Sequence, residues 1–256
     1  MKGWWLYINR SIFLYGDIGD NFNLTSIPFI EAAGGDNAKI AVLGLGGDQW
    51  ESYFKRVYKD CWKSLGVKEV ISIIPNKEMK IEKEKLERIN ECSGLLICGG
   101  DTRVYQRVYV NSSVAKFIRE FYFSGKVFAG VSAGALISTN PCTIWGGKVT
   151  KQSNEFVVRS HYNNEDLLID KGIGVLRNCI VEPHFSEYGG FPRLIEALEQ
   201  TNEKQGLGID EPICLEIINE KDIKVHGKGR VYFISRNKTL EFRVKVYEPG
   251  DSFSLE

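Results

Sequence analysis

The segment KVFAGVSAGAL, residues 126–136, decides the fold of this chain. It has the pattern of a short apolar strand, then Gly-x-Ser-x-Gly, then the start of a helix. In this context the serine lies on a sharp strand-to-helix turn that presents its hydroxyl, and the glycines permit the strained backbone and the close strand–helix packing. The helix start adds N–H groups and a positive dipole end that suit an oxyanion. We interpret Ser132 as a nucleophile on a nucleophile elbow; the alternative is an ordinary β–α turn of small residues.

Apolar runs alternate with helical patterns on the N-terminal side of this elbow. The predicted strands are 11–15, 39–43, 69–74 and 94–98, and the predicted helices are 22–33, 49–65, 80–92 and 104–123, the last with a break near Asn111. Each strand is a nearly continuous apolar run, which is typical of a parallel sheet covered on both faces. The sequence therefore predicts an α/β fold with a doubly wound, mostly parallel sheet and helices on both faces.

The pattern after the elbow is looser. It predicts short strands in 142–150 and 155–158, a strand over 177–181, a helix over 191–200, a strand ending at 206–211, and a C-terminal β-meander over 213–218, 223–226 and 230–234. No linker or internal repeat interrupts the chain. We predict one α/β domain over 1–256, with an N-terminal aromatic segment 1–10 and a C-terminal β extension 212–256.

Composition excludes several function classes. The 33 basic and 33 acidic residues balance, so no nucleic-acid footprint is expected. No apolar run approaches the roughly 18–20 residues of a membrane span. The N-terminus lacks a signal-peptide core, and the six scattered cysteines form no C-x-x-C pair. These features predict a cytoplasmic protein with reduced thiols, no membrane or nucleic-acid partner, no metal and no cofactor.

A nucleophilic serine needs a base, and histidine is the usual one. Of the three histidines, His184 follows an apolar strand as Ser132 does, whereas His161 lies in a polar loop and His226 in the terminal meander. The carboxyl ends of parallel strands gather at one sheet edge. We therefore assign His184 as the base; the alternative is a strand-end histidine satisfied by local hydrogen bonds.

The carboxylate that orients the histidine is expected at another strand end. Asp210 and Glu211 both qualify, and neighbouring strand residues point to opposite faces, so only one can face His184. Glu182 is a further candidate, and the residues alone leave this choice open. For the oxyanion, we expect the N–H of Ala133 and an N–H from the glycine turn at 99–101; the alternative is a plain strand-to-helix turn there.

Four motifs together resemble the dipeptidase E and cyanophycinase family of serine peptidases. They are Gly-Gly-Asp at 99–101, Gly-Val-Ser-Ala-Gly-Ala at 130–135, Pro-His-Phe at 183–185 and Gly-Ile-Asp-Glu at 208–211. The resemblance implies a class I glutamine amidotransferase-like fold, with serine in place of cysteine at the elbow. It also implies a triad of Ser132, His184 and Glu211, with the amides of Gly100 and Ala133 as the oxyanion hole.

The chain departs from the cyanophycinase pattern around the histidine. Those enzymes carry Asp-Gln before the histidine, several arginines after it and a glutamine after Gly-Gly-Asp. Here Glu-Pro precedes the histidine, Tyr188 and Gly190 stand at arginine-like positions, Arg193 is retained, and Thr102 replaces the glutamine. Asn-Pro-His-Phe in dipeptidase E is similar to residues 182–185, but dipeptidase E lacks the long C-terminal extension.

We therefore expect a serine peptidase or amidase that hydrolyses a small peptide, isopeptide or amide substrate. The candidate substrate-binding residues are Asp101, Thr102, Glu182 and Arg193. The Arg193 side chain has two interpretations. It either binds a substrate carboxylate through a bidentate contact, or it is a solvated residue on the surface of a helix. The functional alternatives are a true cyanophycinase that cleaves a β-Asp-Arg polymer and a catalytically silent binding module. The N-terminal aromatics are expected to pack on the domain, with self-association into a homodimer as the alternative.

Overall fold

The computed structural model describes residues 9–144, 167–238 and 241–256. Three sequence predictions lie outside these residues: the packing of the N-terminal aromatics Trp4, Trp5 and Tyr7, the strands expected within 145–150 and 155–158, and the loop that holds His161.

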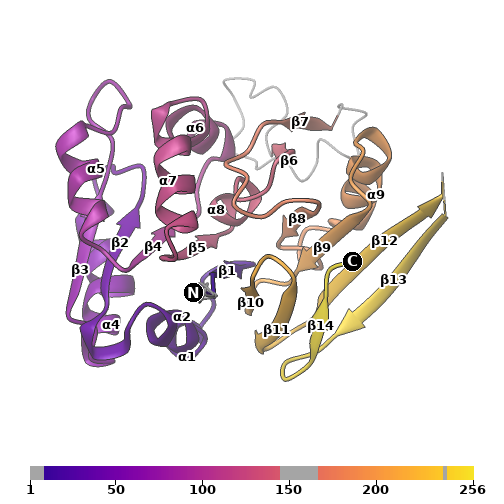
Figure 1. The fold of residues 1–256 in the computed structure, drawn as a ribbon, viewed down its shortest axis with the longest axis horizontal. Helices are drawn as coiled ribbons and strands as arrows, with labels where there is room; N and C mark the ends of the chain where they lie inside the picture. Colours follow the sequence, from indigo (N-terminus) through magenta and orange to yellow (C-terminus); the bar gives the residue numbers. More distant parts are fainter. Residues whose placement is uncertain (1–8, 145–166, 239–240) are drawn as a thin grey trace, which may run out of the picture.

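A large sheet runs through the molecule in the strand order β14-β11-β10-β1-β5-β4-β2-β3 (Figure 1). Its parallel half consists of β1 (Ser11–Tyr15), β2 (Lys39–Leu43), β3 (Glu69–Ile73), β4 (Gly94–Ile97) and β5 (Val127–Val131). Its antiparallel half consists of β10 (Ile213–Ile218), β11 (Asp222–Gly227) and β14 (Ser252–Ser254). The parallel strands β4 and β5 are buried along their whole length, as the continuous apolar runs predict.

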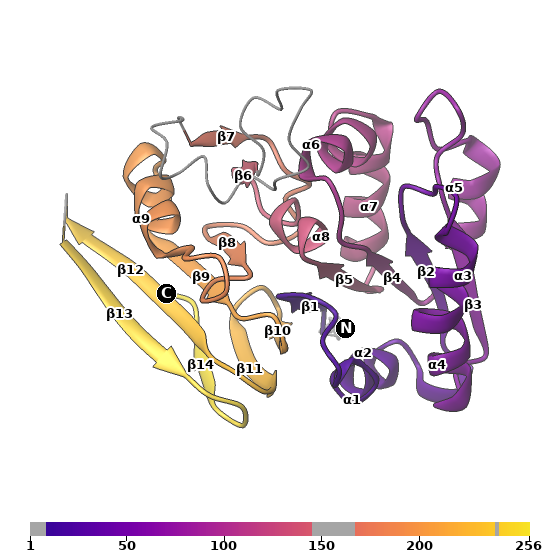
Figure 2. The ribbon, with the colours of Figure 1, turned by 180° about the vertical axis from the view of Figure 1, so that it is seen from behind.

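Helices cover both faces of the parallel half, which confirms the predicted fold class. In Figures 1 and 2, α1 and α2 lie on one side of the sheet and α6, α7 and α8 on the other. The helices are α1 (Phe22–Thr25), α2 (Ile27–Ala32), α3 (Trp50–Phe54), α4 (Asp60–Ser64), α5 (Lys83–Asn90), α6 (Thr102–Tyr105), α7 (Ser113–Phe123), α8 (Ala133–Leu136) and α9 (Phe191–Gln200), with short turns η1 (Gly35–Asn37), η2 (Lys55–Lys59) and η3 (Gln106–Val110).

The predicted break near Asn111 is confirmed. Asn111 ends η3, and the Ser112 hydroxyl then accepts a hydrogen bond from the Val114 N–H at the start of α7. The predicted helix 49–65 is one helical stretch in which the wider turns of η2 join α3 to α4.

A second sheet has the order β13-β12-β9-β8. It comprises β8 (Ile180–Pro183), β9 (Gln205–Ile209), β12 (Val231–Lys238) and β13 (Glu241–Tyr247), and a separate pair joins β6 (Cys142–Ile144) to β7 (Leu168–Asp170). The C-terminal strands are therefore present, but the third strand of the expected meander is in a different sheet: β12 pairs with β9 instead of β11. Alternation within a strand identifies its faces and not its partner, so the pattern could not show this exchange.

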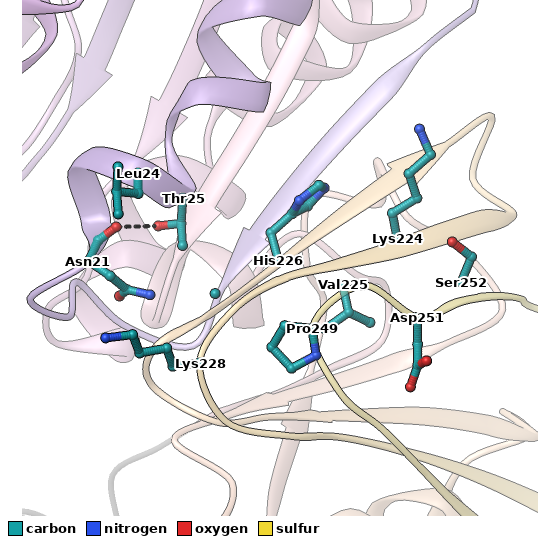
Figure 3. A pocket seen from close by; sticks show the side chains of 12 residues that line it. Asn21, Leu24, Thr25, Lys224, Val225, His226, Lys228, Pro249, Asp251 and Ser252 are labelled. Atoms are coloured by element: carbon teal, nitrogen blue, oxygen red, sulfur yellow. Dashed lines mark hydrogen bonds between the residues drawn. The ribbon is translucent and has the colours of Figure 1, made fainter.

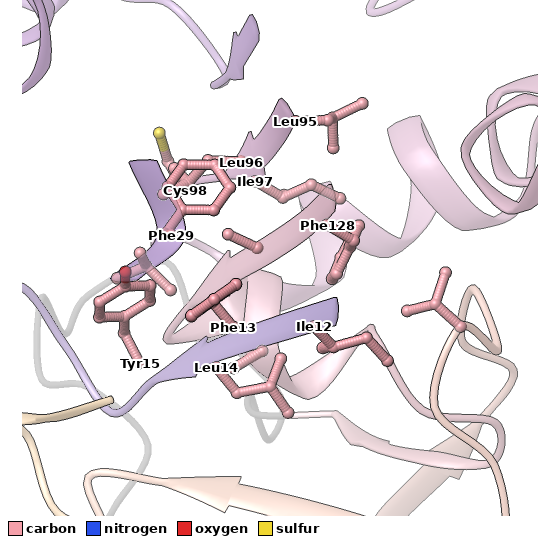
Figure 4. Packing of buried hydrophobic residues seen from close by; sticks show 14 of the residues in the cluster. Ile12, Phe13, Leu14, Tyr15, Phe29, Leu95, Leu96, Ile97, Cys98 and Phe128 are labelled. Carbon is pink, nitrogen blue, oxygen red and sulfur yellow. The ribbon is translucent and has the colours of Figure 1, made fainter. Parts of the chain in front are cut away.

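The main core lies beneath the elbow. Phe13, Phe29, Leu95, Ile97 and Phe128 are fully buried there and pack together with neighbouring strand residues (Figure 4). A smaller cluster under the second sheet holds the helix α9 against β8 and β12. None of the helices in the described residues is long and apolar enough to cross a membrane. Because close-packed interiors deform little, the main core gives the elbow a rigid base.

Candidate active site

The elbow between β5 and α8 depends on its two glycines. A Cβ on Gly130 would lie 2.5 Å from the Gly134 carbonyl oxygen, and a Cβ on Gly134 would lie 2.2 Å from that of Ile97. Ser132 itself has φ 50° and ψ −111°, a strained conformation for a residue with a side chain. Its N–H donates to the Tyr15 carbonyl at 3.0 Å, which ties the turn to β1. The glycines thus permit the close approach, and β1 holds the strained serine in place.

His184 meets Ser132 at the end of β8. The Ser132 Oγ and the His184 Nε2 are 2.8 Å apart. His184 also has a positive φ, 51°, so the chain turns sharply as it leaves the strand. The Tyr188 ring stacks on the imidazole with 4.8 Å between ring centroids. His184 is buried, with 5 % of its surface exposed. The structure therefore brings the predicted nucleophile and the predicted base into direct contact.

Glu211 lies on the opposite side of the imidazole from Ser132. Its Oε1 is 2.8 Å from the His184 Nδ1, and its side chain remains 32 % exposed. The neighbouring Asp210 points elsewhere: its carboxylate accepts hydrogen bonds from the N–H groups of Ser186 and Arg230. The structure thus places Glu211, and not Asp210, against the histidine. Both residues lie just beyond the end of β9, so the expected strand alternation does not apply and the turn after the strand sets their directions.

Glu182 lies in a buried polar network with Arg193. The Arg193 Nε is 2.6 Å from Glu182 Oε1, and the Thr143 hydroxyl donates to Oε2 at 2.8 Å. Glu182 is fully buried and Arg193 is 8 % exposed. The alternative in which Arg193 is a solvated helix residue is therefore wrong, because its guanidinium is inside the protein. A substrate contact of either residue stays a prediction.

Asp101 and Thr102 begin helix α6. The Asp101 Oδ1 accepts hydrogen bonds from the N–H groups of Arg103 at 2.9 Å and Val104 at 3.1 Å, so this carboxylate is an N-cap. Thr102 is 4 % exposed. Asp101 thus stabilises the start of α6, and Thr102 is part of the protein interior. A contact of either side chain with substrate stays a prediction.

The glycine turn after β4 lies beside Ser132. A Cβ on Gly99 would be 3.1 Å from the Ser132 Cβ, and Gly100 has φ 151°, which favours glycine. Ala133 is the first residue of α8, so no carbonyl within that helix accepts its N–H. The two turns therefore flank the hydroxyl, and the assignment of the Gly100 and Ala133 amides as an oxyanion hole stays a prediction.

Asp17 is a neighbour of the triad that sequence reasoning did not single out. Its carboxylate, one imidazole nitrogen and the Glu211 carboxylate lie within 4.8 Å of one another. The Asp17 N–H also donates to the Glu211 carbonyl at 2.9 Å. The available signal was the Gly-Asp turn after β1, which ends at the same sheet edge. A cation bound by these groups would have to break the hydrogen bond of the imidazole to Ser132 or to Glu211, because each imidazole nitrogen lies 2.8 Å from one of these side chains.

Two groups near the triad have shifted pKa values. Burial raises the pKa of Glu187 above its usual value, and the charges of Asp210 and Glu211 add to this effect. Burial, followed by the charges of Glu211 and Asp17, raises the pKa of Tyr188. Burial and the nearby carboxylates thus disfavour the charged form of both side chains.

A cavity of about 510 Å³ lies on the far side of the Glu211 loop, between α1, β11 and the turn 249–252 (Figure 3). Within the described residues, none of the triad side chains lines it. Two of its lining residues support the loop from behind, because the Asn21 side-chain amide and the Lys228 N–H both donate to the Pro212 carbonyl.

Comparison with known families fits this geometry. The family model described as peptidase family S51 matches residues 25–225. The chain belongs to peptidase family S51. The predicted resemblance to the dipeptidase E and cyanophycinase group is confirmed, and this S51 protein is a peptidase, hence a hydrolase.

Two named relatives are similar to this chain over most of its length. The S51 chain is 28 % identical over 232 residues to the cyanophycinase of Synechococcus elongatus, covering 89 % of this chain and 69 % of that protein. It is 27 % identical over 238 residues to the cyanophycinase of Geminocystis herdmanii, covering 89 % and 81 %.

Among solved structures, a peptidase from an acI-B1 Actinobacterium matches with a TM-score of 0.72 at 17 % identity, covering 96 % of this chain and 97 % of the other. A Listeria monocytogenes protein described as a candidate peptidase E matches with a TM-score of 0.57 at 15 % identity, covering 86 % and 100 %. These two structures show the same fold.

The cysteines offer no competing nucleophile at the elbow. Cys98, next to the Gly99 turn, is buried, and burial raises the pKa of its thiol to about 12. A thiol with such a pKa is almost entirely protonated near neutral pH and is a poor nucleophile. Cys98 therefore does not compete with Ser132, whose role as the nucleophile stays a prediction.

Proposed function

We propose that this S51 peptidase hydrolyses a peptide or isopeptide bond through an acyl-enzyme on Ser132, with His184 as general base and Glu211 as the carboxylate that orients it. The observation that carries the proposal is the continuous contact from Ser132 Oγ to His184 Nε2 to Glu211 Oε1, with 2.8 Å at each step. Nucleophile, base and orienting group within hydrogen-bond reach form the arrangement required for an activated serine.

The resting imidazole carries its proton on Nδ1. A carboxylate is only an acceptor, so the contact with Glu211 requires an N–H at Nδ1. Nε2 is then the acceptor for the Ser132 hydroxyl. This tautomer is the one that can remove the serine proton as the oxygen attacks.

In the acylation step, Ser132 Oγ forms a bond to the scissile carbonyl carbon while His184 Nε2 takes the hydroxyl proton. The carbonyl oxygen becomes an oxyanion, which the amides of Gly100 and Ala133 stabilise. The imidazolium, held by Glu211, then gives its proton to the leaving nitrogen as the C–N bond breaks. An ester between the substrate acyl group and Ser132 remains.

In the deacylation step, water attacks the ester carbonyl and gives a proton to His184 Nε2. The tetrahedral intermediate collapses, the C–O bond to Ser132 breaks, and the imidazolium returns its proton to the serine oxygen. The carboxylic acid product leaves, and the enzyme is restored without a cofactor.

A second candidate is cleavage of a β-Asp-Arg polymer, because the named relatives are cyanophycinases. The packing at the arginine-like positions favours the broader assignment. A Cβ on Gly190 would lie 2.9 Å from the Phe185 ring, and Tyr188 stacks on His184. Arg193 is buried against Glu182. A chain that cleaved this polymer would have to recognise its arginines with other residues.

A fluorophosphonate probe tests the proposed chemistry. We expect covalent labelling of the wild-type protein and none of Ser132→Ala, with Ser124→Ala as the matched control, since its hydroxyl donates to the Phe121 carbonyl away from the triad. Folded wild-type protein that stays unlabelled would support the binding-module alternative. Incubation with β-Asp-Arg polymer and with α- and β-linked dipeptides then separates the two substrate classes.

A further inference from the structure

The loops that carry the base and the orienting carboxylate hold each other by two hydrogen bonds in opposite directions. The Ser186 N–H, two residues after His184, donates to Asp210 Oδ1 at 3.2 Å. The Glu211 N–H donates to Glu187 Oε1 at 3.2 Å. Each loop therefore gives one carboxylate and one backbone donor to the other.

The strands beneath prepare this arrangement. β8 and β9 are parallel, and Pro183 pairs with Ile209, so both loops begin side by side at the same sheet edge. The Phe185 N–H also donates to the Ile209 carbonyl at 3.1 Å. Beyond these residues the ladder ends, and the Asp210 and Glu187 carboxylates join the loops on either side of the contact between His184 and Glu211.

Asp210 uses both of its oxygens. Oδ1 accepts from Ser186, and Oδ2 accepts from the Arg230 N–H at 2.9 Å. The residue is only 6 % exposed, and the Arg230 carbonyl accepts from its N–H at 3.2 Å. Hydrogen bonds from backbone amides to an ionised carboxylate are stronger than neutral ones, so Asp210 firmly joins the two loops to the residue that precedes β12.

We propose that Asp210 and Glu187 are positioning residues that form a reciprocal clamp, which keeps the His184 imidazole at hydrogen-bond distance from both Glu211 and Ser132. This inference rests on the proposed triad. His184 leaves its strand with a positive φ, so the ladder does not hold its loop. Proton transfer depends steeply on geometry, and a misplacement of about 1 Å can cost roughly 100-fold in rate.

The two clamp residues respond differently to amide substitution. In Asp210→Asn, the amide nitrogen must face one of two N–H donors, so one hydrogen bond is lost and a donor is left opposite a donor. In Glu187→Gln, the side-chain carbonyl can still accept from the Glu211 N–H. In Glu187→Ala, that acceptor is removed. The clamp therefore predicts that Asp210→Asn and Glu187→Ala slow the labelling of Ser132. It also predicts that Glu187→Gln recovers most of the labelling rate that Glu187→Ala loses.

The experiment measures the rate of fluorophosphonate labelling of the full chain from about pH 5 to about pH 9, a range that spans the ordinary histidine pKa of about 6.5. We expect Asp210→Asn and Glu187→Ala to label roughly 10- to 100-fold more slowly. We also expect the shape of the pH profile to change in both variants, because the contact between the imidazole and the Glu211 carboxylate is loosened. Among the described residues, Glu211, Asp17 and Tyr188 face the imidazole and are unchanged in these variants.

The matched control is Asp251→Asn, whose carboxylate accepts from the Glu248 N–H in a turn remote from the triad. It should label at the wild-type rate. Urea unfolding of every variant shows whether the labelled protein is folded. Because Glu187 is exposed, Glu187→Ala keeps the test decisive if Asp210→Asn does not fold. Labelling of both clamp variants within twofold of wild type, with an unshifted profile, would overturn the clamp.

A second readout separates this inference from the proposed function. The proton between His184 Nδ1 and Glu211 should give a low-field resonance in the proton NMR spectrum that is absent from His184→Ala. If wild-type protein does not label, the proposed catalysis fails, but the clamp is still tested by this signal. Its loss or shift in Asp210→Asn and Glu187→Ala supports the clamp, and an identical resonance in both variants contradicts it.

Discussion

Ser132 Oγ and His184 Nε2 are 2.8 Å apart although 52 residues separate them in the chain. Both residues have a positive φ, 50° and 51°, at the point where each leaves a buried strand. Two strained turns, one at the end of a strand in each of the two larger sheets, thus face each other. Strain of this kind persists only where the surroundings hold it. Here the core lies beneath the turn after β5, and hydrogen bonds join the loop after β8 to the loop after β9.

Substitution of Glu211 by glutamine should abolish most of the activity while leaving the fold intact. The amide can offer an N–H to the imidazole and favour the wrong tautomer, as with other triad carboxylates, so we expect roughly a 10³- to 10⁴-fold loss in kcat or labelling rate. The chain provides a matched control in Glu216→Gln, because Glu216 Oε2 contacts His226 Nε2 at 3.0 Å outside the site. Equal losses in both variants would mean that the effect is not specific to the triad.

Acid should weaken the protein partly through Glu216. The hydrogen bond from His226 lowers the pKa of this carboxyl below its ordinary value of 4.5. A carboxyl whose pKa is lower in the folded state adds stability above its unfolded pKa, and that contribution is lost as the pH falls through the folded pKa. The free energy of unfolding of wild type should therefore exceed that of Glu216→Gln near neutral pH, and the gap should close below about pH 4.5. Urea unfolding across this range measures it; a gap that widens in acid would contradict the assignment.

Alanine at Gly134 should destabilise the elbow. The new Cβ would meet the Ile97 carbonyl oxygen at 2.2 Å, which is backbone and cannot rotate away. We expect a loss of about 1–3 kcal/mol in the free energy of unfolding, with slower labelling of Ser132. Gly35→Ala is the control, because its Cβ would meet nothing within 4 Å. Because Gly35 has a left-handed backbone conformation, Gly35→Ala should lower the free energy of unfolding by about 1 kcal/mol. It should leave the labelling of Ser132 unchanged.

Replacement of Arg193 by methionine should cost far more stability than loss of a surface cation. The guanidinium is 2.6 Å from the fully buried Glu182 carboxylate, and removal of one member of a buried pair costs about 3–5 kcal/mol. Lys116→Met is the matched control, since the Lys116–Glu120 pair is exposed and should contribute no more than about 1 kcal/mol. Chemical unfolding of the two variants under the same conditions makes the comparison. Similar losses in the free energy of unfolding of both variants would show that the buried pair contributes no more stability than the exposed pair.

Much of the fold was predictable from local pattern. The strands at 11–15 and 39–43 have the predicted bounds, and the helix over 191–200 does also. Apolar runs and glycine turns are local signals, and they are strong here because the parallel strands are buried on both faces. The same signals identified Ser132 on its turn and His184 at a strand end.

The residues alone did not select Glu211 over Asp210 or Glu182. That choice came from family resemblance, and the structure now places Glu211 at the imidazole while Asp210 binds backbone and Glu182 binds Arg193. Asp17 was not singled out at all, because a Gly-Asp turn after a strand has no distinctive chemistry until its neighbours are known.

The order of strands, helices and turns, and the glycines that the elbow requires, are properties of short segments and are written in the sequence itself. The partner of each strand and the direction of each carboxylate depend on contacts between segments far apart in the chain. β12 pairs with β9, and the carboxylates of Asp210 and Glu187 accept hydrogen bonds between the loops after β8 and β9. These segments meet only in the folded molecule. Hydrogen bonds across such distances in sequence leave no periodic trace along the chain, so only the tertiary structure could assign them.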